Sequence, residues 1–484
     1  MKTKVLIILS YLIVCLFYIQ LGDSAIYETL YHSDNLFLPL FSNDLNQWNF
    51  SHWYLPPSNY LFPDAVAMCI FSFIVPDLSL PIAFGILNLI LLQLSTFLYL
   101  RILRGERFAL KMNLFSLLLL SLLGSIFFFD GSRINPFVYL MTSGHHISVI
   151  YILFFSLYLI KKIDLIEVDQ NDQTRNLKYH CMRFLHLATL VLIYASDRFV
   201  IIYFSTFLLS QFRNRKFQKY FLFFLLAVIL GEFFNYMMSL FFRSPSSFEI
   251  FFKHLNNTNI YQILIVLIHY LYDFIKFWFY QVSFGFSIAF LICLLSFVFG
   301  SRSFSTQVQF VHLYGILSFL FLIVVGRFVY LHPFPIRYMV GYFYLAFFFG
   351  MLSILVRLGA HKLRLEQIAI FNLIFISLVF ICFQPVIQER TALNLNLRAQ
   401  VVAMIRIKFG NNAFKTDYHS EKKIRFYSQN LVNPHPFDHH GKPYFWITGA
   451  FQPAPSRLGI SEGEIVSSQT KQRFWIPNSL TKDF

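Results

Sequence analysis

The sequence predicts an all-α polytopic membrane protein of about eleven transmembrane helices, with a small C-terminal exoplasmic α/β domain. Of its 484 residues, 57% are hydrophobic and only 13% are charged, which is about half the charged fraction of a soluble protein. Apolar runs of about 17–25 residues, long enough to cross a bilayer, recur as far as about residue 384. Beyond that point Pro, Asn, Gln, His and charged residues replace them.

The apolar runs define the predicted membrane domain, residues 1–384. The predicted spans are 4–21, 80–100, 112–129, 147–160, 181–196, 199–212, 219–241, 281–299, 309–326, 338–356 and 367–384. The first run has the basic start and apolar core of a secretory signal, but Asp23 stands where a cleavage site needs a small residue. We therefore expect an uncleaved first helix.

Basic residues predict the orientation. Lys and Arg gather before the first span and in the loops around residues 101–111, 161–183, 213–219 and 357–364, whereas residues 22–63 contain neither. Under the positive-inside rule the basic loops are cytoplasmic. This places the N-terminus in the cytoplasm, and the loop 22–79 and the C-terminus on the exoplasmic side.

Two apolar segments do not fit this count as spans. Residues 259–280 contain His269, Asp273 and Lys276, and a crossing there would invert every later loop. Residues 64–76 are too short to cross. We therefore expect both segments to lie at the membrane surface or to be partly embedded.

The predicted C-terminal domain, residues 385–484, is long enough to fold as a small unit. Its stretches KIRFYSQNLV and KPYFWITGAF suggest short strands between turns. It also contains the run NPHPFDHHGKP, in which an exposed Pro/Gly loop is the favoured interpretation over a metal site.

Several function classes are excluded. The net charge of +15 comes from basic residues at the ends of apolar segments, and no basic stripe with stacking aromatics indicates nucleic-acid binding. The five cysteines have no ligand spacing, so neither a zinc site nor a disulfide framework is predicted. No Gly-rich phosphate loop, HExxH helix or nucleophile elbow is present. No cofactor is therefore assigned, although a divalent metal stays open.

Carboxylates in the first exoplasmic loop are the first candidates for chemistry. Asp34 and Asp44 lie among aromatic and aliphatic residues that favour a loop folded onto the membrane face. Partial desolvation there raises the pKa of a carboxyl group toward the range of a general base. The alternative for both is a helix cap or a solvated residue. Asp64 follows Pro63 and precedes an apolar run, so an N-cap is its first explanation.

Other polar residues share the exoplasmic side by topology. They are Arg133, His145, His146, Asp197, Arg198, Arg337 and Tyr338. Arginine can hold a phosphate by paired hydrogen bonds, although a snorkelling arginine is the alternative for Arg337. Asp197 and Arg198 could equally form an ion pair or a cap. Adjacent histidines cannot both face one way on a helix, so one of them lining a polar cavity is favoured over a metal pair.

Three short motifs resemble the GT-C superfamily of integral-membrane glycosyltransferases. They are HSDNLFLPLFSNDL after the first span, SDR between the fifth and sixth spans, and IRY at the start of the tenth. The first loop also runs on to a Leu-Phe-Pro-Asp turn that ends at Asp64. Many members have an Asp-Glu pair in the first loop, whereas Asp34 is followed by Asn35.

The resemblance implies a polyprenyl-phosphate sugar donor and a glycan, lipid or protein acceptor. It further implies that Asp34 is the general base, that Arg337, with Arg198 or Arg133, neutralises the lipid phosphate, and that the protein lies in a bacterial inner membrane. Two alternatives stay open. A transporter or lipid flippase would use Glu232 and Asp273, and a noncatalytic envelope-assembly protein would work through its tail.

Overall fold

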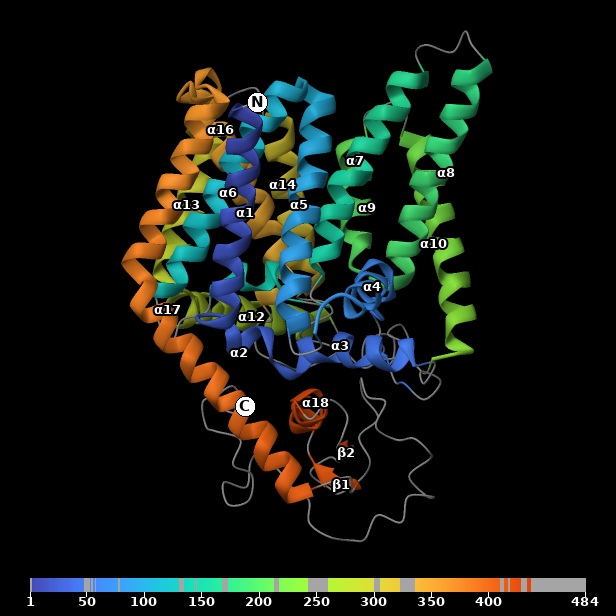
Figure 1. Ribbon diagram of the computed structural model, residues 1–484. Coiled ribbons are helices and arrows are strands. Elements are labelled where there is room, and N and C mark those ends of the chain that lie inside the picture. Colours follow the sequence, from blue (N-terminus) through green and yellow to red (C-terminus); the bar gives the residue numbers. More distant parts are fainter. Residues whose placement is uncertain are drawn as a thin grey trace.

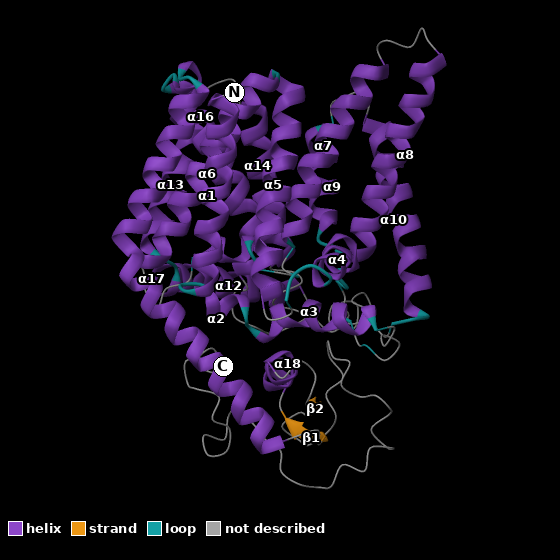
Figure 2. Cartoon of the chain, viewed as in Figure 1, coloured by secondary structure: helices purple, strands orange, loops and turns teal. Residues whose placement is uncertain are grey.

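The structure is a computed structural model. It describes residues 2–47, 53, 55–56, 58–76, 79–129, 135–142, 144, 146–167, 173–212, 217–242, 260–299, 305–322, 336–409, 413–416, 418–427 and 433–436. Almost all of these residues are helical, and the two strands lie in the tail (Figure 2).

Every predicted span falls on a helix over its described residues. These helices are α1 (Lys2–Asp23), α5 (Leu80–Arg104), α6 (Glu106–Phe129), α7 (Ile147–Glu167), α8 (Gln173–Ser196), α9 (Val200–Ser210), α10 (Phe217–Ser239), α13 (Phe284–Phe299), α14 (Ser305–Leu322), α16 (Val340–Arg357) and α17 (Leu365–Phe409). Within the described residues, six helices are long and apolar enough to cross a membrane, in α1, α5, α6, α10, α16 and α17. The protein is thus an all-α integral membrane protein, and eleven crossings stay a prediction.

The helices pack as a bundle in which consecutive helices such as α5 and α6 are neighbours, and in which helices far apart in the chain also meet, as α1 does with α17. Figure 1 shows α1, α5, α6, α13, α14, α16 and α17 gathered on one side and α7 to α10 on the other. Close approach of α13 and α16 depends on Gly350, where an added Cβ would lie 2.8 Å from the carbonyl oxygen of Cys293. Lys111 Nζ donates to His361 O at 2.6 Å and ties together two turns at the end where the N-terminus lies.

Four short helices and the longer α12 cover the opposite end of the bundle. They are α2 (Tyr27–Leu30), α3 (Ser33–Asn46), η1 (Leu61–Ala65), α4 (Val66–Ser72) and α12 (Ile260–Gln281). Figure 1 shows α12 running across this end of the bundle near α2 and α3. Trp278 of α12 packs on Phe286, Phe290 and Phe343, while Tyr272 and Phe279 are exposed. This arrangement suits the surface position predicted for 259–280 and for 64–76, and their depth in a bilayer stays a prediction.

The tail differs from the sequence prediction in two ways. α17 continues through Pro385 as far as Phe409, so the composition change at residue 385 falls inside a helix. Proline is tolerated in membrane helices where other groups satisfy the freed carbonyl. Within the stretch predicted to be a strand, residues 423–427 instead end α18 (Tyr418–Tyr427). An ion pair between Glu421 and Arg425, one helical turn apart, and burial against α3 outweigh the strand propensity of Ile, Phe and Tyr.

Two short strands complete the described tail. β1 (Ala413–Thr416) and β2 (Asn433–Pro436) pair in parallel with Ala413 opposite Asn433. Tyr27 and Tyr31 stack, and Tyr31 also stacks on Tyr427 of α18, with ring centres 6.3 Å apart. The tail is therefore fixed onto the first loop. The stretch KPYFWITGAF and most of NPHPFDHHGKP lie outside the described residues.

Candidate functional site

The first loop folds into a helix that begins at the predicted acid. His32 is the N-cap of α3, and its Nδ1 accepts a hydrogen bond from the backbone N–H of Asp34 at 3.3 Å. Asp34 lies in the first turn, where the helix dipole favours a negative charge. The local sequence therefore fixes the position of Asp34 in the first turn of α3.

Asp34 meets an arginine 303 residues away in the chain. Arg337 lies in the short helix η6 (Ile336–Met339), and its Nη1 is 3.2 Å from Asp34 Oδ2. The two side chains, called here the outer pair, are 27% and 35% exposed. An acid that can accept a proton and a cation that can bind an anion thus lie together, both within reach of a substrate.

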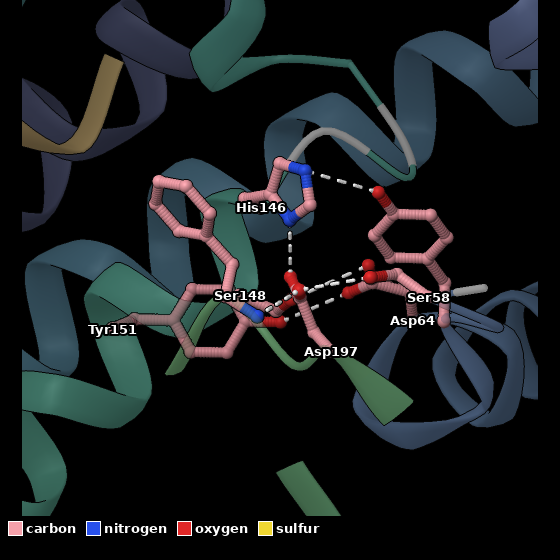
Figure 3. Close-up of polar contacts among 8 residues, drawn as sticks. Ser58, Asp64, His146, Ser148, Tyr151 and Asp197 are labelled. Carbon is pink, nitrogen blue, oxygen red and sulfur yellow. Dashed lines mark hydrogen bonds and ion pairs between the residues drawn. The ribbon is translucent and has the colours of Figure 1, made fainter. Parts of the chain in front are cut away.

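A second polar group lies deeper, and we call Asp64, His146 and Asp197 the inner cluster (Figure 3). His146 Nδ1 is 2.7 Å from Asp197 Oδ2, and its Nε2 is 3.3 Å from the hydroxyl of Tyr60. His146 has a positive φ of 65°, which is uncommon outside glycine. The fold therefore holds this histidine in an unusual backbone conformation between an acid and a phenol.

Asp197 combines two roles. Its Oδ1 accepts hydrogen bonds from the Phe199 backbone N–H at 3.0 Å and from Ser58 Oγ at 3.3 Å, in the turn before α9. The N-cap position of α9 is Phe199 and has no side-chain cap bond, so Asp197 stabilises this turn without being the helix cap considered from the sequence. Its other oxygen orients His146, as an acid does in a positioning pair.

Asp64 is fully buried behind these residues and does not cap its helix. It accepts hydrogen bonds from Ser148 Oγ and the hydroxyl of Tyr151, both at 3.4 Å and both from α7. The N-cap expected from the sequence is wrong, because these side chains on α7 take its oxygens and no side-chain cap bond forms. Burial, together with the negative charge of Asp197, raises the pKa of Asp64 to about 7.

The pKa of Asp64 predicts a pH-dependent stability. Its ionised form is disfavoured in the folded protein, so stability falls as the pH rises from about 4 to 7, by at most about 4 kcal/mol. In Asp64→Asn this fall should be largely absent. Thermal unfolding of detergent-solubilised protein at pH 5 and pH 8 measures it. Glu106→Gln, at an exposed pair with Arg101, should keep the wild-type dependence, and an equal dependence in Asp64→Asn would contradict the assignment.

Tyr338 connects the outer pair to the inner cluster. Its ring centre is 4.8 Å from that of His146, and the guanidinium carbon of Arg337 is 5.4 Å from the same tyrosine ring. The order Asp34, Arg337, Tyr338, His146, Asp197 therefore forms one contiguous path. Five of the residues predicted to share the exoplasmic side lie along it.

Arg198 has a different neighbour. Its Nη2 is 3.1 Å from Glu232 Oε2, and the hydroxyl of Tyr194 donates to the other oxygen of Glu232 at 2.9 Å. The ion-pair alternative applies to this arginine, with Glu232 rather than Asp197 as its partner. Glu232, the carboxylate proposed for a transporter, thus forms an ion pair with Arg198.

Asp44 lies apart from the outer pair, about 15 Å along α3 from Asp34. It is buried, accepts a hydrogen bond from Trp53 Nε1 at 2.8 Å, and pairs with Arg425 at 3.1 Å. Burial alone would lower the pKa of Arg425, but Glu421 and Asp44 raise it above its ordinary value. Asp44 therefore forms an ion pair that joins α3 to α18. It does not lie at the outer pair, where the sequence analysis considered it as a catalytic residue.

Some predicted residues cannot be placed. Arg133 and His145 lie outside the described residues. Among the residues that the structure describes, no group of three or more His, Cys, Asp or Glu could hold a metal ion. Sequence reasoning did not single out Tyr60 and Trp53, which are buried and contact His146 and Asp44. It also missed Tyr151, whose spacing of three from Ser148 was the available signal.

Of the three comparisons with known proteins, the comparison with solved structures found matches. No protein-family model and no curated protein matches the sequence. Solved structures of oligosaccharyltransferase from Archaeoglobus fulgidus, a GT-C glycosyltransferase, are similar to it. AglB in complex with an inhibitory peptide and a dolichol-phosphate has a TM-score of 0.44 and 13% identity, covering 88% of this chain and 64% of that one.

Two further structures of the archaeal enzyme give similar values. The complex with zinc and sulfate has a TM-score of 0.42 and 11% identity, covering 88% of this chain and 62% of that one. The form tethered to an acceptor peptide containing the NVT sequon has 0.39 and 12%, covering 88% and 63%. The chain thus spans less than two thirds of their length. Because TM-scores below 0.5 do not establish a common fold, the functional case depends on the site itself.

Proposed function

We propose that this protein is a membrane glycosyltransferase that moves a sugar from a polyprenyl-phosphate donor to an acceptor at the exoplasmic membrane face. The observation that supports this most is the outer pair, in which Asp34 and Arg337 are 3.2 Å apart and partly exposed. Transfer from a glycosyl phosphate needs a base for the incoming hydroxyl and a cation for the departing phosphate. The pair supplies both.

The proposed reaction is a single displacement. The acceptor oxygen forms a bond to the anomeric carbon of the donor, while the bond from that carbon to the phosphate oxygen breaks. The proton of the acceptor hydroxyl passes to Asp34, and the lipid phosphate leaves with the electron pair. One displacement at the anomeric carbon inverts its configuration.

The contact between the two residues suggests how the base becomes active. Arg337 favours the ionised form of Asp34 in the absence of substrate. When the donor phosphate binds, the guanidinium shares its charge with the phosphate, and the share increases as negative charge builds up on the leaving group. The carboxylate of Asp34 then becomes a stronger proton acceptor at the moment that the acceptor loses its proton.

The inner cluster would position this machinery. His146 packs against Tyr338, which adjoins Arg337, and Asp197 fixes the ring of His146. These residues are buried, so the proposal does not use them as the base. We assign them to holding Arg337 in place and to lining the cavity in which the substrates would bind.

The proposal also includes the orientation of the protein in the membrane. The basic turns and the N-terminus would face the cytoplasm, and α2, α3 and α18 lie at the other end of the bundle (Figure 1). Eleven crossings would then place Asp34 and the tail on the exoplasmic side, in a bacterial inner membrane. The tail would bind the acceptor, which is a glycan, a lipid or a protein, or would close the cavity.

Mass spectrometry of lipid-linked sugars and envelope glycans, from cells with and without this protein, tests the proposed class. We expect one sugar to disappear from one glycan and its lipid-linked donor to accumulate in the deletion strain. The identity of both molecules would follow from their masses. An unchanged glycan and donor pool in the deletion strain would rule out a transferase, and would favour a transporter or an assembly protein.

A further inference from the structure

We propose that a recess at the opposite end of the bundle from Asp34 binds the head group of a phospholipid, with the lipid phosphate at Arg183. The recess lies between α7, α8 and α10 and is partly open to the surroundings. Ile160, Ile163 and Phe223 form its apolar wall. Arg183, Asp164 and Lys219 also line it.

The recess is separate from the proposed catalytic site. Arg183 precedes Ser196, the last residue of α8, by 13 positions, which is about 20 Å along a helix. Asp197 and the inner cluster begin directly after that end of α8. In Figure 1 the end of α7 and the start of α8 lie at the same end of the bundle as the N-terminus. A ligand here would thus contact the leaflet away from Asp34.

Arg183 is the group that points to a ligand. Its Nη1 donates to the hydroxyl of Tyr179 at 3.3 Å, and its guanidinium carbon is 5.5 Å and 6.0 Å from the ring centres of Tyr179 and Phe223. Within the described part of the chain it forms no ion pair with a carboxylate. A guanidinium packed between rings keeps most of its five N–H donors free at its edge, in the fork that fits a phosphate.

The other polar groups of the recess already have protein partners. Lys219 Nζ is 2.7 Å from Glu167, and the hydroxyl of Tyr220 donates to Asp164 at 3.4 Å. His186, at the buried side, bonds to Ser156 at 2.7 Å. Arg183 is therefore the lining cation best placed to take an added anion.

The charges select the kind of head group. The carboxylate of Asp164 lines the recess together with Arg183, which disfavours a head group with net negative charge. A head group with a phosphate and an ammonium, such as phosphoethanolamine, matches both signs, and its glycerol and acyl carbons match the wall formed by Ile160, Ile163 and Phe223. The lipid head group and free phosphate would share only the contact between a phosphate and Arg183.

Native mass spectrometry of the full-length protein in detergent, titrated with phosphatidylethanolamine, tests this site. The lipid should bind the wild type with defined stoichiometry and more tightly than phosphatidylglycerol of the same chains. Arg183→Gln should weaken binding about 10- to 100-fold, as expected when hydrogen bonds to a charged group are lost. Arg101→Gln, a surface arginine paired with Glu106 at the same end, should bind as the wild type does.

Each alternative outcome is decisive. Equal lipid binding by the wild type and Arg183→Gln would overturn the site, and tighter binding of phosphatidylglycerol would overturn the zwitterionic head group. Displacement of the lipid by millimolar inorganic phosphate would assign the recess to free phosphate instead. Should Arg183→Gln fail to fold, Arg183→Lys, which keeps the charge but not the fork, should still bind the lipid several-fold more weakly. This outcome is independent of the proposed transferase activity.

Discussion

Replacement of Asp34 by Asn is expected to lower the rate of sugar transfer about 10²- to 10⁴-fold, the contribution typical of a general base. The change keeps the size of the side chain and removes its negative charge, and with it the ability to take a proton. Initial rates of transfer in membranes that contain equal amounts of each protein, with the donor and acceptor found in the deletion strain, measure it. The stability of the protein should change little, because the pair of Asp34 with Arg337 is partly exposed.

Two companion variants sharpen this result. Glu106→Gln makes the same chemical change at a carboxylate paired with Arg101 at the other end of the bundle, and should transfer at the wild-type rate. Arg337→Gln should also be slow, and combining it with Asp34→Asn should cost less than the two single losses multiplied, since the residues act as one unit. Multiplicative losses would show that the two residues act independently.

Replacement of Arg425 by Ala is expected to destabilise the protein by about 3–5 kcal/mol, because it leaves two buried carboxylates without their cation. Arg425 is 3.1 Å from Asp44 and 3.3 Å from Glu421, and its guanidinium carbon is 5.6 Å from the ring centre of Trp53. The midpoint of thermal unfolding in detergent should fall by several degrees. Limited proteolysis should cut the tail sooner, since α18 would lose its bond to α3.

Two variants test whether the unpaired charges cause this loss. Arg101→Ala removes an exposed arginine and should cost less than about 1 kcal/mol. The triple change of Asp44→Asn, Glu421→Gln and Arg425→Met removes all three charges and should recover much of the stability lost in Arg425→Ala. A single Arg425→Ala variant as stable as Arg101→Ala would contradict a role for this ion pair in fixing the tail.

The positions of the helices could be predicted because membrane helices are long apolar runs. All eleven runs fall on helices, and an interfacial position for 259–280 stays a prediction. The helix ends were less accurate, and α17 continues for 25 residues past the predicted end at 384, as far as Phe409. Its last part is polar, so hydropathy could not detect that the helix continues out of the bundle.

Part of the candidate site could be predicted from the membrane topology. Loops on one side of a membrane must lie near one another, so topology alone placed Asp34, Asp197 and Arg337 in one region. The contact between Asp34 and Arg337 agrees with that expectation, whereas their chemical roles stay predictions. Pairings such as Asp44 with Arg425 join residues 381 positions apart and leave no local pattern, so Asp44 looked as suitable for catalysis as Asp34.

The measurement that tests the central claim most directly is the ratio of lipid-linked donor to glycan product. Mass spectrometry would give it in deletion cells that carry either the wild-type protein or Asp34→Asn at the same membrane abundance. If Asp34 is the base of a lipid-linked-sugar transferase, the wild type restores the product, whereas Asp34→Asn leaves the donor accumulated and the product missing. Full restoration of the product by Asp34→Asn would contradict that role for Asp34.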